Sequence, residues 1–139
     1  KLGLGQSLVS PGSLLRDELS LQLSRAHLFA APSHYEGGPG SVYLEAMACG
    51  LPVIGCSGSG AAEVIRDGDT GCLVPPADVA ALAASLRRLL SQPQEREAMG
   101  NRARRFVMEH AESKKCVSDI ADFYAQTAAA LKRQGVSST

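Results

Sequence analysis

The sequence has few aromatic side chains, no excess charge of either sign and no long apolar segment. Tryptophan is absent from its 139 residues, and phenylalanine and tyrosine together make up 4% of them. Lysine and arginine (14) balance aspartate and glutamate (14), so no overall field attracts nucleic acid or an anionic membrane surface. No apolar run approaches the ~20 residues that a transmembrane helix needs. These absences argue against a nucleic-acid-binding protein and against a membrane-spanning one.

The chain also lacks the motifs of a metal centre or a redox site. Its four cysteines form no C-x-x-C pair and have no metal-like spacing to its three histidines. The cysteines are Cys49, Cys56, Cys72 and Cys116. Their small apolar neighbours predict reduced thiols in the core, which suits a cytoplasmic protein. The one D-x-D, Asp67-Gly68-Asp69, we interpret as a turn rather than a metal site, and we expect neither a metal ion nor a cofactor.

What is present is an alternation of short apolar runs and segments of helical periodicity. Strand character is found at 28–31, 52–55 and 71–74, and 8–9 is a further strand or the remnant of one. Helices are predicted at 13–26, 41–49 and 63–65, then after Asp78, from Pro93 to about residue 110, and at 113–134. This alternation predicts an α/β fold, a parallel sheet with right-handed crossovers and flanking helices.

Helical spacing also predicts which side chains face the core. In chain order these are Leu15, Leu19, Leu23 and Ala26, then Leu44, Met47 and Ala48, then Leu82, Leu86, Leu89 and Leu90, and finally Met99, Ala103, Phe106 and Val107. Three arginines of the 93–110 helix, Arg102, Arg104 and Arg105, lie off its apolar side, and we interpret them as a solvated face.

The stretch 32–55 organises the rest of the chain. It reads P-S-H-Y-E-G-G-P-G-S-V-Y-L-E-A-M-A-C-G-L-P-V-I-G, a glycine-rich loop that opens into a helix at Ser41 and stops at Gly50 before the next strand. A loop at the carboxyl end of a parallel strand, leading into a helix, is where open α/β sheets bind ligands. The free N–H groups at the start of such a helix favour a phosphate.

In this stretch the chain resembles the group 1 (family four) glycosyltransferases. The signature is E-G-G-P-G-S-V-Y-L-E-A-M-A-C-G-L-P-V-I-G at 36–55, and the match continues through 63–65, 67–68, 70–71 and 73–76, with a weaker match upstream at 17–19 and 32–33. The resemblance implies the B-type architecture, in which two Rossmann-like domains hold a nucleotide sugar between them. It also implies retaining transfer, with the leaving phosphate assisting the acceptor and no protein nucleophile.

The same resemblance assigns the binding roles. Glu36 would contact donor-sugar hydroxyls, with Gly37 and Gly38 bringing N–H groups to the sugar or diphosphate, and Glu45 would hold the ribose hydroxyls. The nucleotide and diphosphate site is completed by the start of the helix, Gly40, Ser41 and Val42. Eight residues separate the two glutamates where the family usually has seven, so we expect a loop one residue longer.

Only the later part of the family's C-terminal, donor-binding domain is matched. We expect 1–135 to form that partial domain and 136–139 to be a frayed tail. The family's arginine–lysine pair for the diphosphate lies upstream of the match, and neither Lys1 nor Arg16 has its context. The acceptor (a glycan, lipid or small molecule) and any peripheral membrane contact would then belong to a missing N-terminal domain, and the chain alone would be inactive.

Several alternatives stay open from the sequence. Glu45 also suits a carboxylate that offsets a helix dipole, Glu36 an exposed loop acid, and Glu63 a helix cap. The glycines of 58–60 suit a plain turn as well as a ligand contact. For the whole chain, the main alternative is a non-catalytic nucleotide-sugar-binding or interaction module. An epimerase of the same fold is a further alternative; a flavodoxin-like signalling domain would need an acid pair and a phosphorylatable aspartate that are missing.

Overall fold

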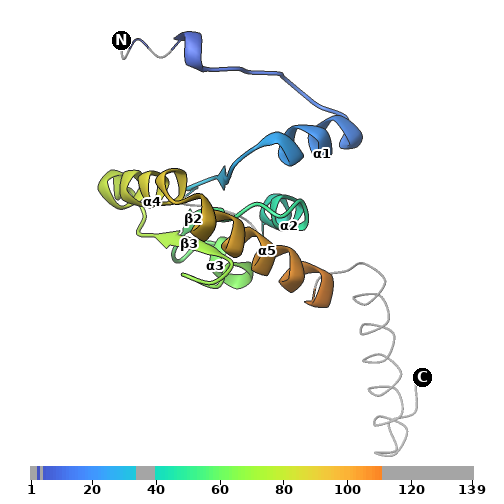
Figure 1. Ribbon diagram of the computed structural model, residues 1–139. Coiled ribbons are helices and arrows are strands. Elements are labelled where there is room, and N and C mark those ends of the chain that lie inside the picture. Colours follow the sequence, from blue (N-terminus) through green and yellow to red (C-terminus); the bar gives the residue numbers. More distant parts are fainter. Residues whose placement is uncertain (1–2, 4, 34–39, 111–139) are drawn as a thin grey trace, which may run out of the picture.

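The computed structural model of the chain describes residue 3, residues 5–33 and residues 40–110. In chain order these form a 3-10 helix η1 (Gly5–Ser7), α1 (Arg16–Arg25), β1 (Phe29–Ala30), α2 (Ser41–Ala48), β2 (Val53–Cys56), α3 (Ala61–Val64), β3 (Gly71–Val74), α4 (Val79–Ser91) and α5 (Pro93–His110) (Figure 1). The helix predicted at 113–134, Cys116 and the tail at 136–139 lie outside the described residues. No helix within the described part is long and apolar enough to cross a bilayer.

The three strands form one parallel sheet in the order β1-β2-β3. Phe29 is opposite Val53, and Val53 is in turn opposite Gly71, so the strands are aligned at their amino ends. The predicted α/β fold, a parallel sheet with flanking helices, is confirmed. The first strand is shorter than the predicted 28–31, and its residues are half-buried or exposed because only β2 pairs with it among the described residues.

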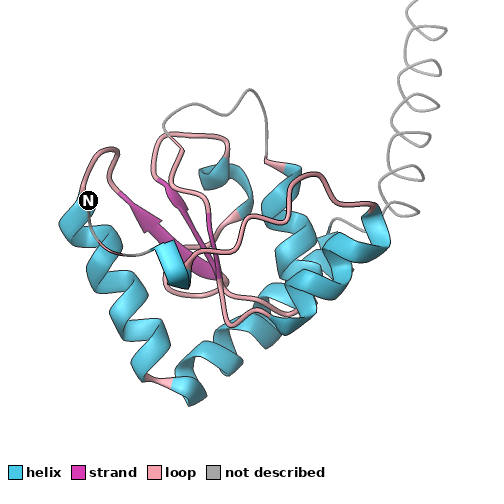
Figure 2. Cartoon of the chain, turned by 90° about the horizontal axis from the view of Figure 1, so that it is seen from above, coloured by secondary structure: helices cyan, strands magenta, loops and turns pink. Residues whose placement is uncertain are grey.

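Both faces of the sheet are covered, as the continuous burial of β2 requires (Figure 2). Successive strand residues point to opposite faces. Val53 therefore belongs to one cluster, here the α2-side core, which includes Tyr43, Met47 and Val107. Ile54 and Cys56 belong to the other, the α4-side core, with Cys72, Val74, Leu89 and Met99.

Local chemistry fixes the helix ends where the sequence predicts them. Gly50 has φ of 80°, and the N–H groups of Gly50 and Leu51 donate to the carbonyls of Met47 and Ala46 at 2.9 and 3.1 Å. This is the glycine-terminated helix end that the sequence indicates for α2. Asp78 caps α4, its Oδ1 accepting from the N–H of Ala81 at 2.8 Å.

Three predictions about apolar residues are wrong at the amino-terminal end: the strand at 8–9 and the burial of Leu15 and of Ala26. Leu8 and Val9 form no strand and are 71% and 90% exposed. The first long helix begins at Arg16 rather than at residue 13, because Leu15 is its extended N-cap, whose N–H donates to Glu18 Oε2 at 2.8 Å. Leu15 is consequently 75% exposed and Ala26, just past the helix, is exposed. Only Leu23 of α1 is buried, with Leu19 packed beside it.

One further core prediction is wrong in α4. Leu90 is 54% exposed, whereas Leu89 is fully buried. Adjacent residues point about 100° apart around a helix, so one of the two faces the sheet and the other faces solvent. In α5 the predicted burial of Met99, Ala103 and Val107 is confirmed.

The thiol predictions hold where the structure describes the residues. Cys56 and Cys72 are buried free cysteines, and Cys49 is a half-buried one. Arg88 donates to the Cys72 sulfur at 3.1 Å. Burial raises the pKa of the Cys72 thiol despite the positive charge of Arg88, so its neutral form is favoured.

Helix α5 passes very close to the turn that ends α2. A Cβ at Gly100 would lie 2.1 Å from the carbonyl oxygen of Gly50, which is far below van der Waals contact. Because residue 100 is a glycine, the backbone of α5 can pack directly against the turn that ends α2. The position of α2 matters because its opposite end carries most of the described candidate site.

Candidate functional site

The carboxyl ends of the three parallel strands lie along one edge of the sheet. The chain leaves this edge after Ala30, Cys56 and Val74. The loop that follows β1 contains Glu36, Gly37 and Gly38, which lie outside the described residues, so their assignment to the donor sugar remains a prediction. The described part of the site begins where this loop enters α2.

The start of α2 has an open amino end. Gly40 is the N-cap in the left-handed region, with φ of 49° and ψ of 73°, and its carbonyl accepts the N–H of Tyr43 at 2.9 Å. The N–H groups of Ser41 and Val42 precede the first intrahelical bonds, and the first turn holds no acidic side chain. This end of the helix therefore offers N–H donors and a positive dipole end without a carboxylate of its own to neutralise them.

Tyr43 ties this helix end to the sheet edge. Its side chain is fully buried, and its hydroxyl donates to the carbonyl oxygen of Ala31 at 2.5 Å. Its ring also meets Phe29 edge-on, with 5.8 Å between the ring centroids. The residue thus joins the end of β1 to the beginning of α2, the two borders of the glycine-rich loop. Sequence reasoning missed this role, although a tyrosine inside the motif of a chain so poor in aromatics was a usable signal.

Glu45 lies one helical turn beyond Ser41 on the same side of α2. Its side chain is exposed and borders a cavity of about 180 Å³ between α1 and α2. The other lining residues are Arg16, Leu19, Ser20, Leu23, Ala48 and Cys49. Within the described residues the Glu45 carboxylate makes no hydrogen bond or ion pair. Because it lies in the second turn, it is poorly placed to offset the helix dipole, the alternative that the sequence left open.

Arg16 shares this cavity with Glu45. Sequence reasoning did not assign Arg16 to the site, because its surroundings do not match the basic motif of the family that the sequence resembles. The two residues are far apart in the chain and are brought together by the packing of Leu19 and Leu23 against α2. The cavity therefore combines one guanidinium, one carboxylate and the Ser20 hydroxyl with an apolar floor.

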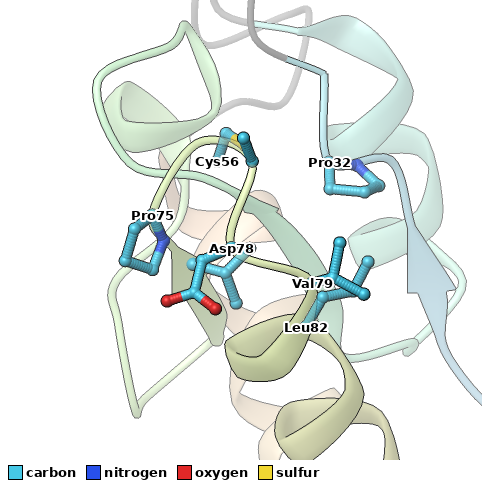
Figure 3. A pocket seen from close by; sticks show the side chains of 8 residues that line it. Pro32, Cys56, Pro75, Asp78, Val79 and Leu82 are labelled. Carbon is cyan, nitrogen blue, oxygen red and sulfur yellow. The ribbon is translucent and has the colours of Figure 1, made fainter.

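A second cavity, of about 200 Å³, lies at the carboxyl ends of β2 and β3 (Figure 3). Val79 and Leu82 of α4 point toward Pro32 across it, and Cys56 and Pro75 form its opposite wall. The Asp78 carboxylate at its border already accepts the hydrogen bond from the Ala81 N–H that caps α4. Its lining has one carboxylate and no cationic side chain, so it does not suit a diphosphate.

Two weaker candidates lie in the turn after β2 and in α3. In the turn at 58–60, Ser59 donates its hydroxyl to the Cys56 carbonyl at 2.9 Å, and Gly58 has φ of 81°. Glu63 is exposed in the first turn of the four-residue α3. The first observation fits a plain strand-to-helix turn, whereas no side chain caps α3 in the described residues, so the cap role that the sequence left open for Glu63 is not seen.

Comparison with known proteins shows what this chain is similar to. The family description "Glycosyl transferases group 1" matches residues 1–106. A GDP-mannose-dependent alpha-(1-6)-phosphatidylinositol monomannoside mannosyltransferase of Mycolicibacterium smegmatis is 35% identical over 115 residues, which cover 78% of this chain and 30% of that protein. The sulfoquinovosyl transferase of Arabidopsis thaliana is 39% identical over 107 residues, which cover 75% of this chain and 21% of that protein.

Solved structures show the same fold. Sucrose-phosphate synthase from Thermosynechococcus elongatus superposes with a TM-score of 0.84 at 33% identity, covering 91% of this chain and 32% of its own. The Anabaena protein HepE, solved in complex with UDP-glucose, superposes with a TM-score of 0.70 at 24% identity, which shows a likeness of fold. The superposition covers 76% of this chain and 29% of HepE. The chain thus spans between 21% and 32% of the length of these relatives. From the family match and these similarities, the chain belongs to the group 1 glycosyl transferases.

Proposed function

We propose that this chain is part of the donor-binding domain of a glycosyltransferase and binds a nucleotide-diphosphate sugar. The parent protein transfers the sugar, with retention at the anomeric carbon, to an acceptor held by its N-terminal domain. The observation that carries this proposal is the exposed Glu45 carboxylate, which has no ion pair among the described residues and lies beside a cavity, one turn from the open amino end of α2.

The spacing along α2 suits the two polar parts of a nucleoside diphosphate. A carboxylate accepts hydrogen bonds from both hydroxyls of a ribose diol, and it repels phosphate. The N–H groups of Ser41 and Val42 lie about one turn away, roughly 5.4 Å along the axis, and suit the diphosphate. The ribose and the diphosphate are joined through one methylene group, so both fit along one side of the helix.

The chemical step needs no nucleophile from this chain. The leaving phosphate assists deprotonation of the acceptor hydroxyl, and the new glycosidic bond forms on the face that the phosphate leaves. The protein's contribution is to orient the donor and stabilise the charge that develops on the diphosphate. We assign the stabilisation of this charge to N–H donors and basic groups, and we expect no metal ion. The free cysteines support a cytoplasmic site of action.

Substitution of Glu45 tests the proposal. In the parent protein, Glu45→Ala should weaken nucleotide-sugar binding by about 2–4 kcal/mol, because two charge-assisted hydrogen bonds are lost. Glu45→Gln should lose less, since its amide still accepts one bond. Calorimetric titration with UDP-glucose and GDP-mannose measures the effect. The matched control is Glu97→Ala, which removes an exposed glutamate from α5. Unchanged donor affinity in Glu45→Ala would refute the ribose assignment.

A non-catalytic nucleotide-sugar-binding module, the alternative that the sequence left open, is the second candidate. Both candidates bind a nucleotide sugar through Glu45, and they differ in turnover. A parent protein that binds donor through Glu45 and transfers no sugar to any acceptor would support the module.

A further inference from the structure

The amino-terminal edge of the sheet carries a polar cavity that the donor site does not use. It has a volume of about 180 Å³ and lies between the turn that precedes β3 and the last turns of α5. Its lining includes Arg66, Arg102, Arg105, Thr70 and Phe106. Because β3 is parallel to its neighbours, this turn is at the opposite end of the strands from the loop that enters α2. The cavity is therefore separate from the candidate donor site.

The turn on one side of this cavity is held by its own hydrogen bonds. The N–H of Arg66 donates to the Thr70 hydroxyl at 2.9 Å, and the N–H of Thr70 donates back to the Arg66 carbonyl at 3.0 Å. Thr70 is 1% exposed. The backbone that carries Arg66 is thus fixed against the sheet rather than free in solvent.

Two of the three guanidinium groups are held in place by contacts that leave donors available. The Arg66 guanidinium carbon lies over the Phe106 ring, 4.6 Å from its centre, in a cation–π contact, and the group forms no hydrogen bond among the described residues, so its N–H donors are left for a ligand. Arg102 bonds through Nε alone, to the Asp69 carboxylate at 2.7 Å and the Asp69 carbonyl at 3.0 Å. Its terminal amino groups have no further hydrogen bond among the described residues.

Arg105 adds a third guanidinium, which forms no ion pair or hydrogen bond within the described part of the chain. Two carboxylates also border the cavity: Asp69, which is bonded to Arg102, and Glu109, which lies 4.0 Å from His110 Nδ1. Three positive and two negative side chains leave a positive balance. Of the α5 arginines that sequence reasoning gave to a solvated face, Arg102 is bonded to Asp69, whereas Arg104 and Arg105 are exposed as expected.

We propose that this cavity binds the phosphate group of a phosphorylated ligand. Guanidinium groups present paired N–H donors that match two oxygens of a phosphate, and here they come from two separate elements around one hollow. A soluble phosphorylated metabolite and the head group of an anionic phospholipid share this chemistry. The inference does not depend on the proposed donor site, since no residue is common to the two.

Titration of the full chain with inorganic phosphate, at constant ionic strength, tests the proposal. Amide resonances of the 66–70 turn and of α5 should shift in a saturable manner at millimolar phosphate. Arg66→Gln and Arg105→Gln should each weaken the binding about tenfold, the loss expected for one charge-assisted contact. Arg104→Gln, which removes an exposed charge of α5 outside the cavity, is the matched control and should bind as the native chain does.

The outcomes separate a site from general charge attraction. Shifts that do not saturate, or that Arg104→Gln reduces as much as Arg105→Gln, would overturn the proposal. Unchanged binding in the Arg66→Gln, Arg105→Gln double variant would overturn it as well. If the site is confirmed, sedimentation with vesicles of phosphatidylcholine, with and without phosphatidic acid, identifies the source of the phosphate. Binding only to the acidic vesicles, competed by inorganic phosphate, indicates a lipid, and absence of vesicle binding indicates a soluble ligand.

Discussion

Replacing Gly100 with alanine should destabilise the chain, although the same change usually stabilises a helix. In an exposed helix interior, alanine is favoured over glycine by about 1 kcal/mol. Here the added methyl group would lie 2.1 Å from the Gly50 carbonyl oxygen, 3.0 Å from its carbonyl carbon and 3.3 Å from Pro52 Cδ. Overpacking costs about 1–3 kcal/mol, and a clash with backbone belongs at the upper end of that range. The net loss of unfolding free energy is therefore about 1–2 kcal/mol.

Urea unfolding followed by circular dichroism measures this loss. The control is Asn101→Ala, which adds a strong helix former at the next, exposed position and should leave the urea midpoint unchanged or raise it. A Gly100→Ala midpoint at or above that of the native chain would show that α5 does not rest on the turn after α2. Because α2 carries Glu45, the variant should also weaken donor binding in the parent protein.

Four other predictions concern the tyrosine, the thiols (two predictions) and the activity of the chain. Tyr43→Phe keeps the ring and removes the bond to Ala31, so urea unfolding should show a loss of about 1 kcal/mol, and an unchanged midpoint would contradict the link between β1 and α2. All four cysteines should react with Ellman's reagent after unfolding without reductant, whereas two or fewer would mean a disulfide. In the folded chain, burial raises the pKa of Cys72 and keeps the thiol protonated at neutral pH, so its alkylation should accelerate at a higher pH than the alkylation of a free cysteine does. Alkylation of Cys72 at the rate of a free cysteine would contradict its burial. The chain alone should transfer no sugar from labelled nucleotide sugars to any acceptor, since positioning by a facing domain contributes about 7–11 kcal/mol of barrier lowering; product above the no-enzyme background would refute this.

The parts of the fold that depend on local chemistry were predictable from the sequence. Gly50 ends α2 because a glycine takes the left-handed conformation readily, and Asp78 begins α4 because its carboxylate reaches the N–H of Ala81. Neither requires knowledge of distant residues. The parallel sheet followed from the alternation of apolar runs and helical segments in the same way.

What the sequence did not predict depends on contacts between distant segments. Leu15 and Leu90 match a helical spacing, but their burial depends on the N-cap and on the side of the helix that meets the sheet. Arg16 joins Glu45 only because α1 packs on α2, and Arg66 joins Arg105 only because the turn before β3 meets α5. The role of Tyr43 requires knowing that the Ala31 carbonyl lies within reach of its hydroxyl.

Helix α5 contributes to both sides of the sheet, and this bears on how the chain unfolds. Met99 packs in the α4-side core, and Ala103 and Val107 pack in the α2-side core. Loss of α5 would expose both cores together, so neither side can melt while the other stays intact. We therefore expect one cooperative transition, with the same midpoint for probes on either face. The amide hydrogens in the middle of α5 should be among the slowest to exchange, because they open only with the whole domain.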